Sequence, residues 1–383
     1  MTDTLKSKLD TVERKVLAGE RLSREDAMAL LACPDLNLLS ALADWKRGQV
    51  TDQAIVTYNI GRNINYTNVC WVRCKFCAFY RTPGHDEGYV LPTEVILEKC
   101  RELVAAGGRE VLLQGGLHPG LKIEWYEDLL RAMKAAYPVD IHGFSSTEIN
   151  YIAHVSRLSL EETLRRLRDA GLDSIPGAAE MIVDDVRDAI APYKEKSQRW
   201  VELMRTAHRL GIPTSATMMF GTVDDDAMRV EHLMLIRALQ DETGGFKAFI
   251  PWSFQPDGTD LQAELGPDWQ PATSFDYLKL VATARLVLDN IPHVQASWVT
   301  QGPRIAQIAL KFGVDDFGST MMEENVVSSA GTSFLMPISE IQRHIRDAGY
   351  RPQLRDTQYR YLPDPPAESV SRDPQLLQIG VPV

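Results

Sequence analysis

Residues 65–77 read Asn-Tyr-Thr-Asn-Val-Cys-Trp-Val-Arg-Cys-Lys-Phe-Cys, and this stretch holds three of the five cysteines of the chain. Cys70, Cys74 and Cys77 follow a C-x3-C-x2-C pattern, so their thiolates can converge on one side of a loop. A [4Fe–4S] cluster held by three thiolates keeps one iron free to bind a substrate or cofactor, whereas a four-cysteine cluster usually only moves electrons. The stretch therefore indicates chemistry at an open iron.

Other uses of the cysteines fit the sequence less well. Structural zinc usually takes four protein ligands, and the sequence contains no second C-x2-C pair. A disulfide is disfavoured because these spacings suit a metal loop and nothing places the chain in an oxidising compartment. Cys33 and Cys100 stand alone in apolar, helical settings, where we expect packed thiols rather than ligands.

The cysteine spacing, with Phe76 directly before the last cysteine, resembles the signature of the radical S-adenosylmethionine (SAM) superfamily. The resemblance implies that Cys70, Cys74 and Cys77 bind the cluster, while SAM chelates the fourth iron through its amino and carboxylate groups. Reductive cleavage of SAM would then yield a 5′-deoxyadenosyl radical. The task of the protein would be to aim this radical and to exclude competing reactions.

Composition narrows the class of protein. The 383 residues carry a formal net charge of −11, which argues against general affinity for nucleic acid or an anionic membrane surface. The sequence contains no apolar run of about 18 residues, so a membrane span and a signal peptide are both unsupported. We expect a cytoplasmic protein, since a reducing compartment suits an oxygen-sensitive cluster.

The hydrophobic pattern predicts three regions. Residues 1–53 form a helical extension, and residues 54–350 alternate short apolar runs with helices of roughly 10 to 18 residues, as βα units on a parallel sheet do. The eight predicted strands are 63–69, 110–114, 139–144, 173–176, 214–220, 246–252, 294–298 and 314–318. Eight βα units predict a (β/α)8 TIM-type barrel. Residues 351–383 are rich in proline, and we expect an irregular tail that packs on the barrel.

The loops that follow the strands of such a barrel form its active site. The superfamily resemblance assigns cofactor contacts to several of them. Gln114, Gly115 and Gly116 follow the second strand, where glycine lets the backbone approach a ligand closely, and the resemblance implies contact with the SAM amino group. The residues after the third and fourth strands that we predict to contact SAM or the substrate are Ser145, Glu148, Glu180 and Arg199, with Arg205 as the alternative arginine.

Ser145, Glu148 and the two arginines each have a second explanation. Ser145 and Glu148 can instead form a capping box at a helix start. For Glu180 we expect a bound partner, because an uncompensated carboxylate at a strand end is costly. Arginine at the positions of Arg199 and Arg205 more often lies on a solvated helix face.

The substrate and the proton transfers have their own candidates. The aromatic strand end at Trp252 suits an aromatic substrate, and Tyr80, Thr217 and Gln255 are predicted to contact it. The candidate catalytic residues are His85, His118 and Glu148, although a histidine in a loop is commonly just exposed. The sequence does not select the base.

Longer stretches resemble one branch of the superfamily, the enzymes of the futalosine route to menaquinone and their deazaflavin-synthase relatives. The resemblance spans nearly all of residues 20–362, and the stretches that carry it are 63–70, 77–81, 84–85, 88–89, 113–116, 216–221 and 240–246. The residues around the cysteines are similar to the cyclase of that route. Trp71 and the acidic run 224–226 depart from the pattern, which leaves fine substrate contacts open.

The cyclase resemblance implies a mechanism. The deoxyadenosyl radical would remove hydrogen from ribose C4′ of dehypoxanthine futalosine, and the carbon radical would add to the benzoate ring of the same molecule. An external electron donor of the flavodoxin or ferredoxin class is implied. The alternatives are the sister activity, which joins the adenosyl radical to an enolpyruvyl benzoate to give aminodeoxyfutalosine, a deazaflavin-synthase activity, and a plain iron–sulfur electron carrier.

Overall fold

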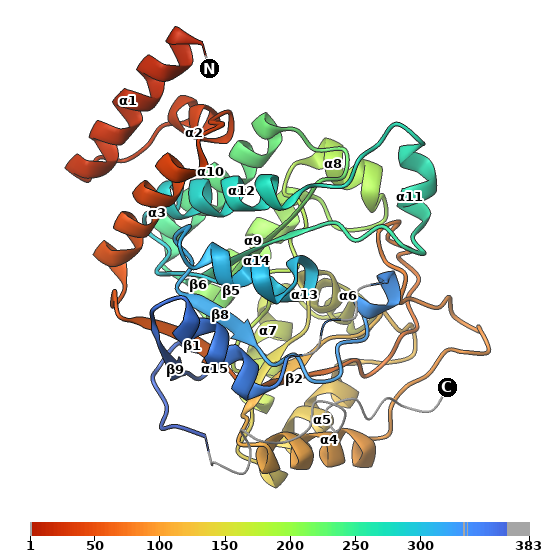
Figure 1. Cartoon of the computed structure of the whole chain (residues 1–383). Helices are drawn as coiled ribbons and strands as arrows, with labels where there is room; N and C mark the ends of the chain where they lie inside the picture. Colours follow the sequence, from red (N-terminus) through yellow and green to blue (C-terminus); the bar gives the residue numbers. More distant parts are fainter. Residues whose placement is uncertain (1, 332–333, 335, 366–383) are drawn as a thin grey trace.

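Three helices precede the barrel in the computed structural model, which describes residues 2–331, 334 and 336–365. They are α1 (Asp3–Ala18), α2 (Arg24–Leu31) and α3 (Leu36–Val50), and they lie together at one end of the molecule (Figure 1). Ser23 caps α2 by accepting from the amide of Asp26, whose carboxylate accepts from the amide of Ser23. This capping box explains why the helix begins at Arg24.

Parallel strands form the barrel wall. They are β1 (Ile55–Asn59), β2 (Gly61–Ile64), β3 (Glu110–Leu113), β4 (Asp140–Gly143), β5 (Thr214–Phe220), β6 (Phe246–Ser253), β7 (His293–Val294) and β8 (Asp316–Ser319). Bridges from His142 to Ser174 and from Ile175 to Thr214 connect β4 to β5. A bridge from Gln295 to Asp316 links β7 to β8, β8 pairs with β1, and a bridge from Met322, just after β8, to Arg62 of β2 closes the ring. The predicted (β/α)8 barrel is confirmed.

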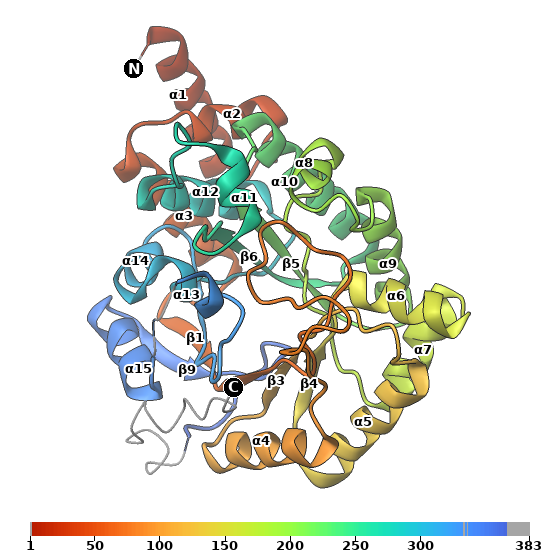
Figure 2. The same ribbon diagram turned by 90° about the vertical axis from the view of Figure 1, so that its right-hand side faces the viewer.

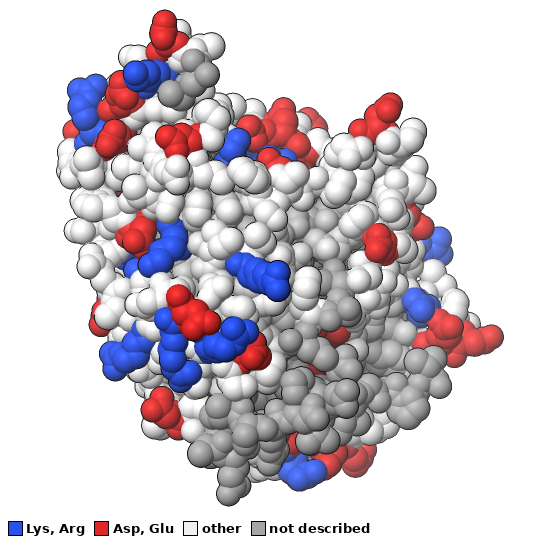
Figure 3. Space-filling view, in the orientation of Figure 1, with Lys and Arg blue, Asp and Glu red and all other residues white. Residues whose placement is uncertain are grey.

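Helices surround the strands, as Figure 2 shows. In order they are α4 (Thr93–Ala105), α5 (Ile123–Ala136), α6 (Ser146–Ser156), α7 (Leu160–Ala170), α8 (Asp184–Ile190), α9 (Ser197–Arg209), α10 (Asp226–Thr243), α11 (Asp260–Leu265), α12 (Ser274–Val287), α13 (Trp298–Gln301), α14 (Pro303–Ala309) and α15 (Ile338–Asp347), with a 3₁₀ turn at Ser328–Ala330. Buried side chains such as Trp200 and Phe246 fill the layer between helices and strands. On the face drawn in Figure 3, acidic and basic side chains are interspersed.

Three predicted strands depart most from their predicted bounds in the structure. The first begins earlier and ends at Ile64, because the hydroxyl of Thr67 and the amide side chain of Asn68 bond to the loop around Tyr89 instead of to a strand. The fourth is reduced to bridges at Ser174 and Ile175, since the next residue is a proline without an N–H group. The seventh ends at Val294, and Trp298 begins α13.

The predicted irregular tail is wrong for its first residues. Strand β9 (Arg351–Leu354) pairs in parallel with β1, so β1 lies between β8 and β9. Arg355 then enters the barrel, where its guanidinium pairs with Asp316 at 2.6 Å and lies 4.0 Å from the ring centre of Tyr359. Residues 355–361 thereby cover the bottom of the barrel, opposite the cysteine loop. Residues 366–383 of the predicted tail lie outside the described residues.

Candidate active site

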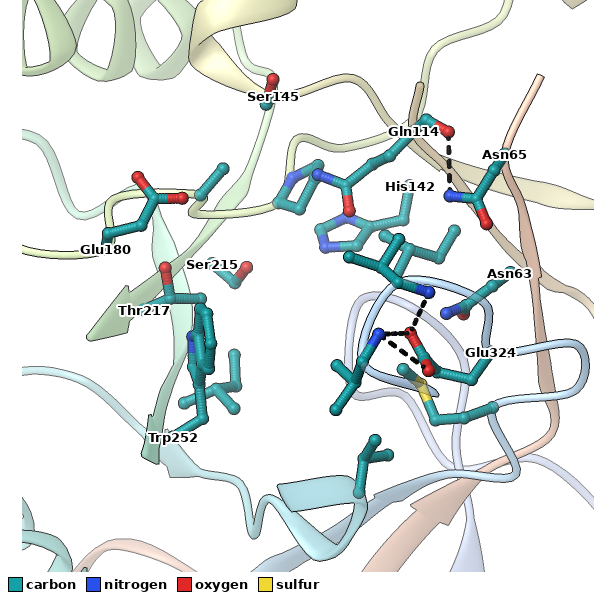
Figure 4. A pocket seen from close by; sticks show the side chains of 18 of the residues that line it. Asn63, Asn65, Gln114, His142, Ser145, Glu180, Ser215, Thr217, Trp252 and Glu324 are labelled. Carbon is teal, nitrogen blue, oxygen red and sulfur yellow. Dashed lines mark hydrogen bonds between the residues drawn. The ribbon is translucent and has the colours of Figure 1, made fainter. Parts of the chain in front are cut away.

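A cavity of about 440 Å³ runs along the barrel interior from the loop of the cysteines toward the floor made by Arg355 and Tyr359. Cys70, Cys74 and Cys77 line its upper end. Figure 4 shows the two walls below: Glu180, Ser215, Thr217 and Trp252 on one side, and Asn65, Gln114, His142, Asn63 and Glu324 on the other. The three cysteines therefore open onto an interior large enough for a ligand.

Backbone hydrogen bonds fix the cysteine loop from several directions. The amide of Cys70 donates to the carbonyl of Arg81 at 2.8 Å, and the amide of Cys77 donates to the carbonyl of Cys74 at 3.0 Å. Lys75 is tied to two distant elements, since its amide donates to the carbonyl of Ile190 and its carbonyl accepts from the amide of Leu261. The loop is thus held by α8, by α11 and by the carbonyl of Arg81 before any cofactor binds.

The donor set fits a cluster. All three thiols are free, and burial raises the pKa of Cys74 and of Cys77, so a metal is needed to stabilise their thiolates. Within the described part of the chain, no three His, Cys, Asp or Glu side chains are close enough to hold a single metal ion. Three thiolates leave one iron of a [4Fe–4S] cluster open, whereas structural zinc usually takes four protein ligands. Cys33 and Cys100 are buried in the core, as predicted.

Gly115 and Gly116 are packed without space for a side chain. A Cβ atom on Gly116 would lie 2.2 Å from the carbonyl oxygen of Val69 and 2.9 Å from Cβ of Cys70. A Cβ atom on Gly115 would lie 2.7 Å from the ring of Tyr66. The strand end after β3 therefore sits directly against the cysteine loop, which requires glycine at both positions.

Glu148 binds three neighbouring donors. Its carboxylate accepts from the hydroxyl of Tyr66 at 2.7 Å and from the amides of Gly115 at 2.9 Å and Ser145 at 2.6 Å. Burial raises the pKa of Glu148, and the hydrogen bonds from Ser145, Tyr66 and Gly115 oppose that shift. The predicted capping box is present, and it joins the start of α6 to the glycine turn and to Tyr66.

The sequence led us to expect a bound partner for the Glu180 carboxylate, and in the structure a side chain of the same protein compensates it. Lys194 pairs with it at 2.5 Å, and both side chains are about nine-tenths buried, with 8% and 10% of their area exposed. Burial alone would lower the pKa of Lys194, but Glu180 and Glu195 outweigh this effect and the pKa is raised. The pair lies on the cavity wall within the electrostatic reach of Cys74.

The turn that carries Glu180 is strained. Ala178 and Glu180 have φ of 41° and 46°, a region that non-glycine residues rarely adopt. Thr217 Oγ1 accepts from the amide of Ala179 at 3.1 Å, and the guanidinium of Arg187 donates to its carbonyl at 2.7 Å. Such strain persists only where the surroundings enforce it, and it is concentrated at functional sites.

Two family models match the chain. Residues 64–236 match the radical SAM superfamily, and residues 243–368 match the CofH/MqnC C-terminal region. The cyclic dehypoxanthine futalosine synthase of Halalkalibacterium halodurans is 44% identical over 92% of this chain and 95% of its own length. The chain belongs to the radical SAM superfamily. Enzymes of this superfamily use a [4Fe–4S] cluster and SAM, and the three cysteines described above fit that cluster.

Other relatives of this radical SAM enzyme carry different names. The 5-amino-6-(D-ribitylamino)uracil–L-tyrosine 4-hydroxyphenyl transferase of Methanothermobacter thermautotrophicus is 42% identical over 94% of this chain and 99% of its own. The aminodeoxyfutalosine synthase of Thermus thermophilus is 39% identical over 92% and 95%. Among solved structures, the hydrogenase maturase HydG from Carboxydothermus hydrogenoformans has a TM-score of 0.73 at 16% identity, covering 93% of this chain and 81% of that one. This likeness shows the shared barrel fold.

The cavity of the radical SAM enzyme brings together most of the predicted site residues. The predicted residues that line it are Phe76, Tyr80, Gln114, Gly115, Gly116, Ser145, Glu148, Glu180, Thr217 and Trp252, in addition to the three cysteines. Arg199 lies elsewhere, and its guanidinium donates to Asn150 and Glu202. Arg205 pairs with Glu242, also outside the cavity.

Three further candidates do not line the cavity. His85 and His118 use Nδ1 to accept from backbone amides two residues ahead, Glu87 and Gly120, within their own loops. Gln255 donates to the carbonyl and the hydroxyl of Ser253 and is not among the residues that line the cavity. Of the three candidate catalytic residues, Glu148 alone faces the interior.

Sequence reasoning missed several residues that line the cavity, among them Asn63, Asn65, His142, Lys194, Ser215 and Glu324. Side chains alternate along β4, so His142 points inward while Ile141 joins the core. The alternation of polar and apolar residues in this strand was the signal that could have identified His142. Lys194 lies in the loop between α8 and α9, and nothing in the linear sequence connects it to Glu180.

No helix in the described part of this chain combines the length and the apolar character that a transmembrane span requires.

Proposed function

We propose that this radical SAM enzyme cyclises dehypoxanthine futalosine, in the manner indicated by the name of its relatives. The observation that carries the proposal is that two proteins named cyclic dehypoxanthine futalosine synthase, from Halalkalibacterium halodurans and Streptomyces coelicolor, are 44% and 43% identical over more than nine-tenths of the chain. The cavity supports it, because its mixed polar and aromatic walls suit a nucleoside-derived substrate that carries a benzoate ring.

The residues of the chain have separable tasks in this proposal. Cys70, Cys74 and Cys77 hold the cluster, which with SAM supplies a carbon-centred radical for hydrogen abstraction. Gly115 and Gly116 let the strand end approach the cysteine loop, and Glu148 fixes that turn through the Gly115 amide. The turn at Glu180, fixed by its pair with Lys194, offers a carboxylate to the SAM side of the cavity.

The substrate contacts follow from the lower walls. Trp252 offers an aromatic face on which a benzoate ring can pack. Asn63, Asn65 and Ser215 supply hydrogen-bonding groups for ribose hydroxyls along the same interior. The barrel wall encloses this space, and enclosure protects a radical from side reactions with water.

The experiment uses anaerobic enzyme, SAM, a strong reductant and dehypoxanthine futalosine deuterated at C4′. We expect deuterium in 5′-deoxyadenosine and a cyclised product with two fewer hydrogens than the substrate. An adenine-containing adduct from the enolpyruvyl benzoate, with the futalosine derivative untouched, would assign the chain to aminodeoxyfutalosine synthesis. A product formed from tyrosine and 5-amino-6-(D-ribitylamino)uracil would assign it to the transferase group.

The reaction also needs an electron. We include in the proposal an external one-electron donor of the flavodoxin or ferredoxin class. We expect turnover when such a reduced carrier replaces the chemical reductant.

Iron and sulfide analysis distinguishes the enzyme from a zinc protein, which would contain no sulfide.

A further inference from the structure

His142 has the features of a proton acceptor. It lies on β4 with its imidazole in the cavity, below Gln114 and on the wall opposite Thr217 and Trp252 (Figure 4). Its Nδ1 is 2.7 Å from Oγ of Ser174, which anchors the ring to the neighbouring bridge. In the tautomer that donates from Nδ1 to Ser174, the other ring nitrogen, Nε2, carries a lone pair and has no hydrogen-bond partner among the described residues.

The carboxylates of the cavity are committed to other groups. Glu148 accepts from Tyr66, Gly115 and Ser145, and Glu180 is paired with Lys194. Glu324 accepts from three backbone amides, at Val326, Val327 and Ser328, with distances of 2.9–3.0 Å. Glu110 faces Arg355 at 3.7 Å on the barrel floor.

The surroundings also keep His142 neutral. Burial and, to a smaller extent, the nearby Arg355 together lower the pKa of His142 to about 3. The imidazole is therefore unprotonated at neutral pH and can accept a proton, which Lys194 and Arg355 as cations cannot do. A weak base is sufficient where the acid is a ring carbon that regains aromaticity when it loses its proton.

We propose that Nε2 of His142 accepts the proton that the benzoate ring loses after cyclisation, an assignment that rests on the proposed function. In this step the bond between C4′ and the ring carbon has already formed and the ring is a cyclohexadienyl radical. The C–H bond at that ring carbon breaks, the proton goes to Nε2, and one electron passes to a one-electron acceptor of the iron–sulfur class. The ring becomes aromatic again, and the imidazolium passes its proton on to water.

The test compares two products in His142→Asn. Asparagine keeps an N–H group for Ser174 and removes the position of Nε2. Hydrogen abstraction from C4′ precedes the proposed step, so deuterium transfer to 5′-deoxyadenosine continues in the variant. We expect the ratio of 5′-deoxyadenosine to cyclised product to rise at least tenfold, because a positioned general base typically contributes 10²–10⁴-fold. Imidazole added to His142→Gly should lower that ratio again.

The matched control is His208→Asn. His208 is a second histidine with a lowered pKa, but it lies on α9, bonds to Thr243 and Thr214, and does not itself line the cavity. We expect this variant to keep the product ratio of the unmodified enzyme. A ratio in His142→Asn that stays equal to that of the control, with both products falling together, would overturn the proposal.

A second measurement needs no cofactor. In the NMR spectrum of protein labelled with ¹⁵N-histidine, the signal that disappears in His142→Asn belongs to His142. We expect this signal to show an unprotonated Nε2 at neutral pH. A protonated Nε2 would overturn the proposal even where a variant folds poorly. Failure of the proposed function itself gives a different result: the unmodified enzyme then transfers no deuterium from C4′.

Discussion

Removal of the Lys194 ammonium should destabilise the protein strongly, because it leaves the Glu180 carboxylate buried without a counter-charge. The two groups are 2.5 Å apart with 8% and 10% of their side-chain area exposed, so solvent screens them little. Breaking a buried ion pair by removing one partner typically costs about 3–5 kcal/mol. We therefore expect Lys194→Met to lower the free energy of unfolding by about that amount.

The double variant makes the prediction specific. Replacing both members of a buried pair by neutral residues is often close to neutral in stability. We expect Lys194→Met with Glu180→Gln to be more stable than Lys194→Met alone by about 2 kcal/mol or more. A double variant that is more stable than the single variant would show that the unpaired Glu180 carboxylate, and not the lost packing of the lysine side chain, causes the destabilisation.

Urea unfolding of cluster-free protein, without SAM and followed by tryptophan fluorescence, measures both effects. With a slope of about 3 kcal/mol per molar urea, the single variant should lose roughly 1 M or more in its unfolding midpoint. The reasoning fails if the single variant loses less than about 0.3 M, or if the double variant unfolds at lower urea than the single one.

Three further outcomes follow from the site and the core. Alanine at Cys70, Cys74 or Cys77 should abolish iron and sulfide binding, whereas alanine at the buried Cys33 or Cys100 should retain both. Gly116→Ala should lower iron content because its Cβ would overlap the Val69 carbonyl, while Gly120→Ala, whose Cβ would approach only the side chain of His118 at 3.1 Å, should not. The free energy of unfolding should fall as pH drops from 7 to 5, because burial lowers the pKa of His142 and His232 to about 3 and of His208 to about 4. The unfolded state binds these protons near pH 6.5, and each one lowers the free energy of unfolding by up to about 1.4 kcal/mol per pH unit. Urea unfolding midpoints at pH 7 and pH 5 check this prediction.

The sequence predicted those parts of the fold where local signals agree. Strand β5 has the bounds 214–220 in both the prediction and the structure, because Pro213 and Gly221 interrupt the apolar pattern at its two ends. Strand β9 was missed because Pro352 argues against a strand. It is tolerated because β9 pairs with β1 alone, so a missing N–H on its outer side breaks no ladder.

The cavity shows a similar division. The cysteines and the glycine turn belong to motifs that can be recognised in the sequence. Lys194 and His142 acquire their roles from partners that only folding brings near. His142 also reverses the usual pattern, since polar residues of β4 face the interior of this barrel. Hydrophobic periodicity identifies such a strand but does not show that its polar face lines a cavity.

The pairing of β1 with both β8 and β9 also bears on how the chain is made. Residues 55–59 leave the ribosome early, but the partners on their two sides are residues 316–319 and 351–354, and Arg355 joins Asp316 afterwards. The first strand must therefore wait until residue 354 has been synthesised before its hydrogen bonds are complete. Closure of the barrel is in this sense a late event of biosynthesis, and a nascent chain stalled before residue 351 would expose an open edge of β1 to chaperones and to other chains.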